Sequence, residues 1–106
     1  MENRRNSRRS VDLSVVIRSS FGLIIGKARN VSFSGVYVET APAVTLSKNS
    51  VVEVAFPIYD HMEPVPARVA RATVGGLGLS FPEAGTSARA IGALIDRPES
   101  GLGTSL

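Results

Sequence analysis

Residues 65–81 read Val65-Pro-Ala-Arg-Val-Ala-Arg-Ala-Thr-Val-Gly-Gly-Leu-Gly-Leu-Ser-Phe81, an alternating pattern interrupted by a glycine pair. Apolar residues occupy every second position: Val65, Ala67 and Val69 before Gly75-Gly76, and Leu77, Leu79 and Phe81 after it. Because successive side chains of a strand point to opposite faces, this pattern predicts two strands that each bury one face. The glycine pair predicts the turn between them. Pro66 has no backbone N–H to donate, so it favours an edge position or the start of pairing.

The same period of two continues upstream. Val11, Leu13, Val15 and Ile17 alternate with polar residues, and further short apolar segments follow at residues 23–28, 36–40 and 52–56. Stretches rich in Ser, Gly and Asn separate these segments and predict turns. Pro57 is predicted to end the fourth strand, and residues 60–64 are predicted to form the next turn.

Only the C-terminal part changes period. Ala88, Ile91, Leu94 and Ile95 fall on one helical stripe that follows an N-cap at Thr86 or Ser87 and stops before Pro98. Six short strands between Val11 and Phe81 leave no room for crossover helices, which excludes a parallel α/β sheet. The sequence therefore predicts a mainly β fold, a six-stranded antiparallel β-barrel with a C-terminal α-helix, since closure removes exposed strand edges.

Length and composition limit the class of protein. The 106 residues suffice for one hydrophobic core, and 43% hydrophobic with 20% charged residues indicates a chain that folds. The absence of cysteine excludes disulfides, thiolate zinc sites and cysteine nucleophiles. No apolar run reaches the length of a signal peptide core or a membrane span, so we expect a cytoplasmic protein without membrane insertion.

The first ten residues carry the whole net charge. Their four arginines, offset by Glu2, contribute +3, which equals the formal net charge of the chain, +3. Arginine presents a planar fork that matches phosphate and stacks on flat rings. We interpret residues 1–10 as a flexible anion-binding arm, residues 11–97 as the barrel with its helix, and residues 98–106 as a loose tail. Alternatively, the arginines are only a solvated, solubilising terminus.

Two motifs lie on either side of the first two predicted strands. Arg4 to Arg9 lead directly into the first strand, and Asn30-Val-Ser-Phe-Ser-Gly35 joins the second and third. The pair resembles the signatures of the PilZ domain, which are Arg-x-x-x-Arg before the first strand and Asp/Asn-x-Ser-x-x-Gly after the second. The resemblance extends to residues 35–40, 67–71 and 76–81. Each motif alone is common in proteins, but both in this order, at these offsets from the strands, are specific.

The resemblance implies a bacterial receptor of the second messenger cyclic di-GMP. The ligand-binding residues that it implies are Arg4, Arg5, Arg8, Arg9, Asn30, Ser32 and Gly35. The chemistry of the ligand agrees with this assignment. Cyclic di-GMP is a dianion with two guanines, so its receptor needs cations, donors to guanine O6 and N7, and flat surfaces. Arginine supplies all three. Arg4 with Arg8 and Arg5 with Arg9 both satisfy the first signature. We favour the first pair, because members of the family that it resembles usually follow the second arginine with two residues and then a Val that begins the strand, which here are Arg8, Arg9-Ser10 and Val11. Whether one or two ligands bind stays open.

The expected function is that of a stand-alone receptor that orders its arm on binding cyclic di-GMP and signals to a protein effector. One alternative is a nucleic-acid-binding small β-barrel, favoured by an isoelectric point of about 10.0. Only two Tyr, four Phe and no Trp argue against it, because such barrels stack bases on aromatic side chains. Another alternative is a ligand-free PilZ-like interaction module, although every signature residue is present here.

Plainer interpretations apply to single residues. Asn30 and Ser32 can simply close a turn, and the basic side chains outside the arm are typical of solvated faces: Lys27, Arg29, Arg68 and Arg71. His61, the only histidine, lies in a polar turn without a neighbouring nucleophile. No catalytic constellation, metal site or cofactor is predicted, so we do not expect an enzyme.

Overall fold

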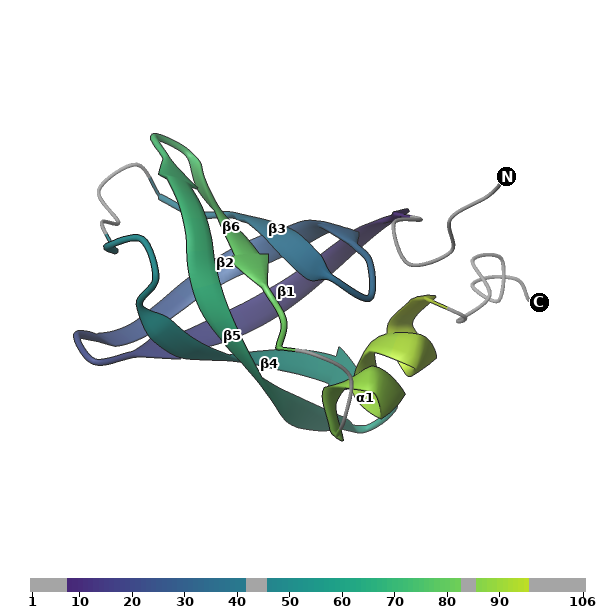
Figure 1. Ribbon diagram of the computed structural model, residues 1–106. Coiled ribbons are helices and arrows are strands. Elements are labelled where there is room, and N and C mark those ends of the chain that lie inside the picture. The colour runs from purple at the N-terminus through teal and green to yellow at the C-terminus, as the bar shows by residue number, and fades with distance from the viewer. Residues whose placement is uncertain (1–7, 42–45, 83–85, 96–106) are drawn as a thin grey trace.

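The computed structural model describes residues 8–41, 46–82 and 86–95, which form a closed barrel and one helix (Figure 1). The elements are β1 Arg9–Ser19, β2 Gly22–Val31, β3 Gly35–Glu39, β4 Val51–Ile58, β5 His61–Thr73, β6 Gly76–Ser80 and α1 Thr86–Ile95. Neighbouring strands are antiparallel in the order β1-β2-β3-β6-β5-β4, and pairing of β1 with β4 closes the ring. The predicted six-stranded antiparallel barrel with a C-terminal helix is confirmed.

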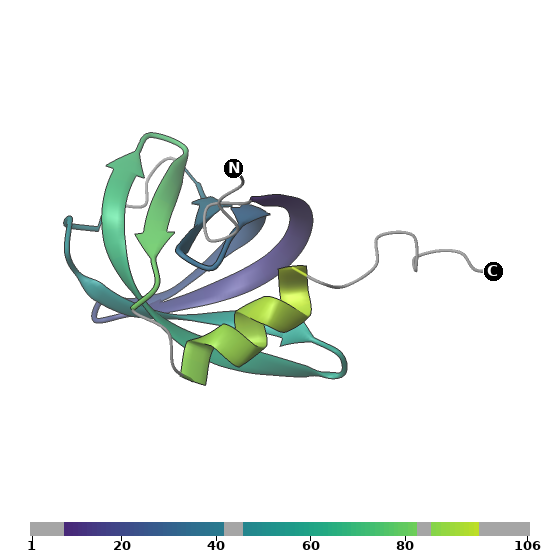
Figure 2. The ribbon, with the colours of Figure 1, turned by 45° about the vertical axis from the view of Figure 1, so that its right-hand side comes forward.

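The core contains the side chains that the period of two assigns to inner faces. Fully buried examples come from three strands: Val15, Ile17, Val54, Phe56 and Val69. Burial of each such side chain is worth about 1.5–3 kcal/mol. Helix α1 lies across one end of the barrel, contacts β2, β4 and β5, and buries Ile91 and Leu94 (Figure 2). The predicted apolar stripe of the helix therefore completes the core.

Three prolines lie inside strands, and in each case one side of the strand has no partner at that point. Pro57 does not end β4, as the sequence predicts, because β4 continues to Ile58 and pairs Pro57 with Met62 of β5. The pairing of β4 with β1 covers only residues 53–55, so Pro57 needs no donor towards β1. Likewise, β5 pairs with β6 only from Arg68 onward, after Pro64 and Pro66. The edge position predicted from Pro66 is confirmed.

The turn near these prolines and the start of β1 also differ from expectation. Strand β5 begins at His61, so the predicted turn over residues 60–64 shrinks to Tyr59 and Asp60. Tyr59 adopts a positive φ of 56°, which lets two residues reverse the chain. At the N-terminus, β1 begins at Arg9, two residues before the predicted start of the barrel. The rest of the predicted arm, residues 1–7, and the predicted tail, residues 98–106, lie outside the described residues.

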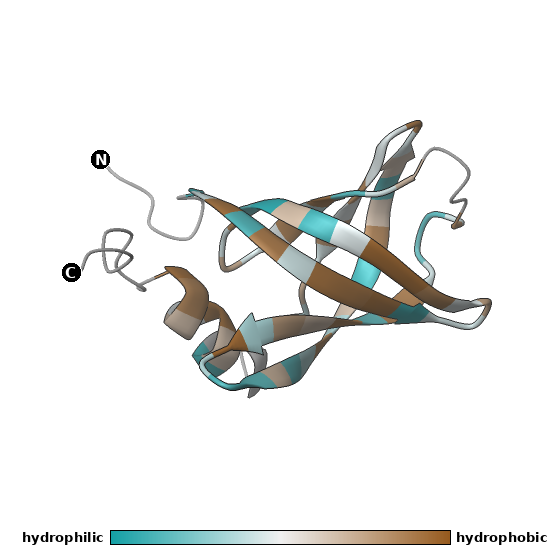
Figure 3. Ribbon diagram, turned by 180° about the vertical axis from the view of Figure 1, so that it is seen from behind, coloured by the Kyte–Doolittle hydropathy of each residue, from teal (hydrophilic) through white to brown (hydrophobic). Residues whose placement is uncertain are grey.

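One side of the outer surface carries an apolar row. Ile25 of β2 pairs with Val16 of β1, Val16 pairs with Ala55 of β4, and Ala55 pairs with Pro64 of β5. Ile25 is 75% exposed, and the apolar colour of the β1–β2 hairpin is visible from this side (Figure 3). The row is centred on β1 and β4, which lie opposite β3 and β6 in the ring of strands. The polar surface described next is centred on β3 and β6.

Candidate functional site

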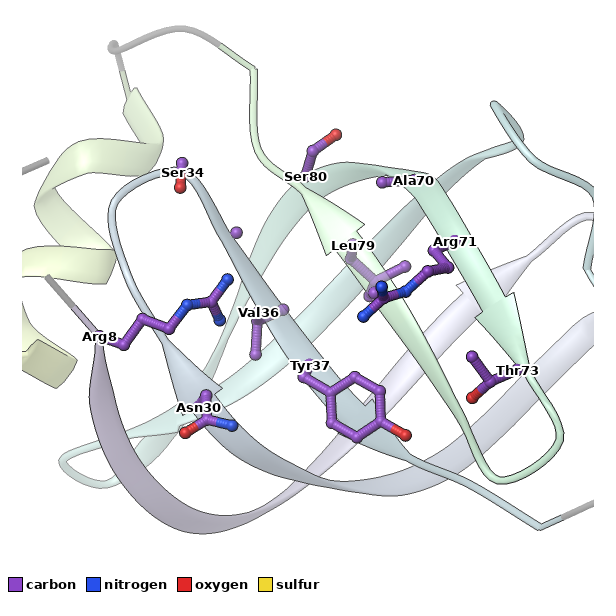
Figure 4. A pocket seen from close by; sticks show the side chains of 12 residues that line it. Arg8, Asn30, Ser34, Val36, Tyr37, Ala70, Arg71, Thr73, Leu79 and Ser80 are labelled. Atoms are coloured by element: carbon purple, nitrogen blue, oxygen red, sulfur yellow. The ribbon is translucent and has the colours of Figure 1, made fainter. Parts of the chain in front are cut away.

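A groove of about 860 Å³ lies on the outer surface over β2, β3, β6 and the C-terminal half of β5 (Figure 4). Arg8 and Asn30 line one end, Arg71 and Thr73 line the other, and the ring of Tyr37 lies between them. The lining side chains that the structure describes include two arginines and no carboxylate. A concave surface with this charge favours an anionic ligand.

Four lining residues form a continuous row across four strands. Asn30 of β2 pairs with Tyr37 of β3, Tyr37 pairs with Gly78 of β6, and Gly78 pairs with Arg71 of β5. Directly paired residues of antiparallel strands share a face of the sheet. The row therefore forms the floor of the groove, with its lowest point at Gly78, which has no side chain.

Two β-bulges turn Asn30 and Arg71 outward. The register shifts in β2 between Ala28 and Asn30, and in β5 between Val69 and Arg71. Ala28 and Val69 are fully buried, so regular alternation would direct the residue two positions later into the core. The extra residue of each bulge reverses the alternation. As a result, both polar side chains reach the groove instead of the core.

The turn between β2 and β3 is held by Ser32, whose side chain is 1% exposed. Its Oγ accepts a hydrogen bond from the Ser34 N–H at 3.2 Å and lies 3.0 Å from the Ser34 Oγ, while its own N–H donates to the Gly35 carbonyl at 2.9 Å. The Phe81 N–H donates to the Ser34 carbonyl at 2.9 Å, which ties the turn to the end of β6. Ser32 therefore fixes the turn from inside, and Ser34 lines the groove.

Gly35 allows β3 and β6 to approach each other. A Cβ at this position would overlap the carbonyl oxygen of Leu79 and lie 3.3 Å from the Cα of Ser80. Among the described glycines only Gly22 has a positive φ, so close approach, and not backbone conformation, requires glycine at position 35.

Arg29 lies beside Asn30 in sequence but is already paired. Its guanidinium lies 3.0 Å from Glu39 Oε1 and 3.2 Å from Asp12 Oδ1. The same Asp12 carboxylate lies 3.4 Å from the Lys27 ammonium. These pairs neutralise the basic side chains next to the turn, so the positive charge of the groove comes from Arg8 and Arg71.

Sequence comparison assigns the family. The model of the PilZ domain matches residues 2–97. The chain belongs to the PilZ domain family. Comparison with the sequences of curated proteins gives no match.

Solved PilZ structures share the fold at low sequence identity. The PilZ domain of CeSA from a cellulose-synthesizing bacterium has a TM-score of 0.73 and 18% identity, covering 85% of this chain and 95% of its own. The PilZ domain of YcgR from Escherichia coli, solved with c-di-GMP, has a TM-score of 0.70 and 14% identity, covering 89% of each chain. The Bacillus subtilis inhibitor of motility MotI/DgrA has a TM-score of 0.67 and 19% identity, covering 86% of this chain and 48% of its own.

The PilZ signature residues occupy different places around the groove. Arg8, Asn30 and Gly35 line it. Ser32 is buried beneath the turn, and Arg9 is half-buried in β1, where it pairs with Val31; neither is among the lining residues. Arg4 and Arg5 lie outside the described residues.

Sequence reasoning missed most of the residues that line the PilZ groove. Arg71 was assigned to a solvated face, and Tyr37, Ser34 and Gly78 received no role. A signal for Arg71 exists in the sequence: it follows Val69 by two positions, on what would be the buried face of an unbroken strand. An unpaired arginine is too costly to bury there, which indicates a bulge.

Three further expectations concern His61, metal binding and membrane insertion. His61, predicted to lie in a polar turn, is instead the first residue of β5; it is exposed, with its Nε2 3.0 Å from Glu63 Oε1. Within the described ranges of the PilZ domain, no three His, Asp or Glu side chains are grouped to hold a metal ion. Over the same ranges, no helix has both the length and the apolar character that a membrane span requires.

Proposed function

We propose that this PilZ domain is a receptor for cyclic di-GMP. The observation that carries the proposal is that Arg8 and Asn30, from two signatures more than twenty residues apart in sequence, line one groove that has no described acidic residue. Arg8 offers a fork for phosphate or for the O6/N7 edge of guanine, and Asn30 offers an amide for a base edge. The c-di-GMP in the YcgR structure supports the assignment by family, although the identity is 14%.

The arm belongs to the proposed mechanism. Its four arginines repel one another, and a bound dianion removes that repulsion while accepting several charge-assisted hydrogen bonds. We infer that residues 1–10 become ordered over the groove on binding and that a separate effector protein recognises this ordered state. The position of Arg8 on the groove favours the pair Arg4 and Arg8 for the first signature.

Calorimetric titration of the protein with cyclic di-GMP, with cyclic GMP and GTP as controls, tests the proposal. We expect binding of cyclic di-GMP and much weaker binding of either mononucleotide, because a mononucleotide offers only one base to a groove that carries an arginine at each end. A single-stranded oligonucleotide serves as the competitor for the alternative of a nucleic-acid-binding barrel. Absence of binding at about 50 μM cyclic di-GMP, or preference for the oligonucleotide, would overturn the proposal.

A further inference from the structure

The groove extends well past the PilZ signatures. Arg8 and Asn30 occupy one end, but the wall formed by β5 and β6 contains no signature residue. On that wall Arg71 directs its guanidinium into the groove, towards the space above Tyr37 (Figure 4). The row from Asn30 to Arg71 crosses four strands, which at the usual strand spacing is about 14 Å. The groove therefore offers a second cationic end that the signatures do not account for.

The local structure brings Arg71 to this place and leaves it unpaired. The bulge after Val69 turns it outward beside Gly78, where a Cβ would be in van der Waals contact with it, 3.6 Å from the Arg71 Cβ and 4.0 Å from its Nε. Over the described residues, no carboxylate lies within 4.0 Å of its guanidinium, unlike that of Arg29, which has two such partners. Five N–H donors are thus available to a ligand.

The neighbouring ring suits a flat ligand group. Tyr37 pairs with Gly78, so its ring and the Arg71 guanidinium lie on either side of the low point of the groove. An aromatic ring provides a surface for stacking a base, and an arginine beside it can read the edge of that base. Arginine pairs with the two acceptors O6 and N7 of guanine, whereas adenine presents an N6 donor in place of O6.

On the basis of the proposed function, we propose that Arg71 binds the second guanine of cyclic di-GMP and selects guanine over adenine at that end of the groove. Arg8 and the signature turn hold the first guanine and the phosphates. The two ends therefore differ in position, one at the two signature motifs and one at the bulge of β5 beside Gly78.

The test uses a cyclic dinucleotide with one guanine and one adenine beside cyclic di-GMP. Wild-type protein should prefer cyclic di-GMP by roughly tenfold or more, because the mixed ligand can satisfy only the Arg8 end. Arg71→Ala should lose roughly tenfold in affinity for cyclic di-GMP and bind both ligands with nearly equal affinity. Arg71→Lys should keep only part of the affinity and of the preference, since an ammonium can donate to guanine O6 and N7 but lacks the planar fork.

The control variant is Arg18→Ala, which removes an exposed arginine that pairs with Glu53 away from the groove lining. It should keep both affinities and the preference. Melting curves check that each variant is folded. If Arg71→Ala retains the wild-type preference, or if Arg71→Lys retains wild-type affinity, the inference is wrong while the receptor proposal stands. If the wild-type protein binds neither ligand, the proposed function fails, and this inference fails with it.

Discussion

Single arginines of this barrel differ in whether a carboxylate already holds them. Arg29 has two carboxylates within 3.2 Å, and Arg18 lies 3.8 Å from Glu53 on the opposite side of the barrel. Arg8 and Arg71 line the groove and have no carboxylate partner among the residues that the structure describes. A paired arginine must lose its partner before it binds an anion, whereas an unpaired one loses only water. Groove arginines are therefore the ones whose removal should weaken ligand binding.

Replacing Arg8 with alanine tests whether an unpaired arginine of the groove is needed for ligand binding. Loss of its charge-assisted contacts should cost about 2–3 kcal/mol, roughly a hundredfold in affinity for cyclic di-GMP. The melting temperature should stay unchanged, because Arg8 is exposed and precedes the first strand. Calorimetric titration measures the affinity, and Arg18→Ala, which removes the same charge away from the groove, should bind as the wild type does. An unchanged affinity for Arg8→Ala would contradict the proposed site.

Gly35→Ala tests the close approach of β3 and β6. The added Cβ overlaps the Leu79 carbonyl oxygen, so the strands must separate, and such overpacking costs about 1–3 kcal/mol. For a domain of this size, that cost lowers the melting temperature by roughly 4 °C or more. The matched control is Gly75→Ala, because a Cβ there meets no atom within 4 Å and φ is not positive. Equal melting temperatures for the two variants would show that glycine at position 35 is not required for packing.

Strands and turns show how far the sequence predicts this fold. The period of two identifies the inner faces of β1, β4, β5 and β6, because burial of alternate side chains is a property of each strand by itself. Bulges are different, since an extra residue in one strand is defined only against its partner. Arg71 and Asn30 follow buried residues by two positions, and their outward direction depends on register shifts against β6 and β3. The sequence therefore predicts Asn30 and the signature turn and indicates a bulge before Arg71, but the assembly of the complete groove row depends on how the strands pair.

The arm and the turn over residues 30–35 should respond together to ligand. Amide hydrogen exchange with and without cyclic di-GMP measures this. At short exchange times, we expect protection to increase in the part of the arm before β1 and in residues 30–35, because both segments supply contacts to one ligand. Amides of β4 near Val54 should not change on this timescale, since Val54 is fully buried and its amide exchanges only when the fold opens. Strong protection of the arm in both states would mean that it is docked without ligand, and ordering on binding would then be wrong.

For the whole molecule, the groove joins parts of the chain that are far apart in sequence. Its lining comes from Arg8, from residues 30–37 and from residues 70–80, which meet because β3 pairs with β6 at the centre of the groove face. A ligand that contacts all three parts is bound only by the closed barrel, since an unfolded chain does not bring them together. Ligand binding should therefore stabilise the complete fold, and not only the groove.

Thermal unfolding measures this stabilisation. At a ligand concentration of about 100 times Kd, cyclic di-GMP adds about 2.7 kcal/mol, which raises the melting temperature by roughly 10 °C or more for a domain of this size. At the same concentration, Arg8→Ala should shift by only about 2 °C, because a hundredfold weaker affinity leaves the ligand near its Kd. Without ligand, both proteins should melt at the same temperature. Equal shifts for the two proteins would show that the ligand stabilises the barrel from a place other than this groove. An equal shift with GTP would show that the protein does not distinguish the cyclic dinucleotide from a guanine mononucleotide.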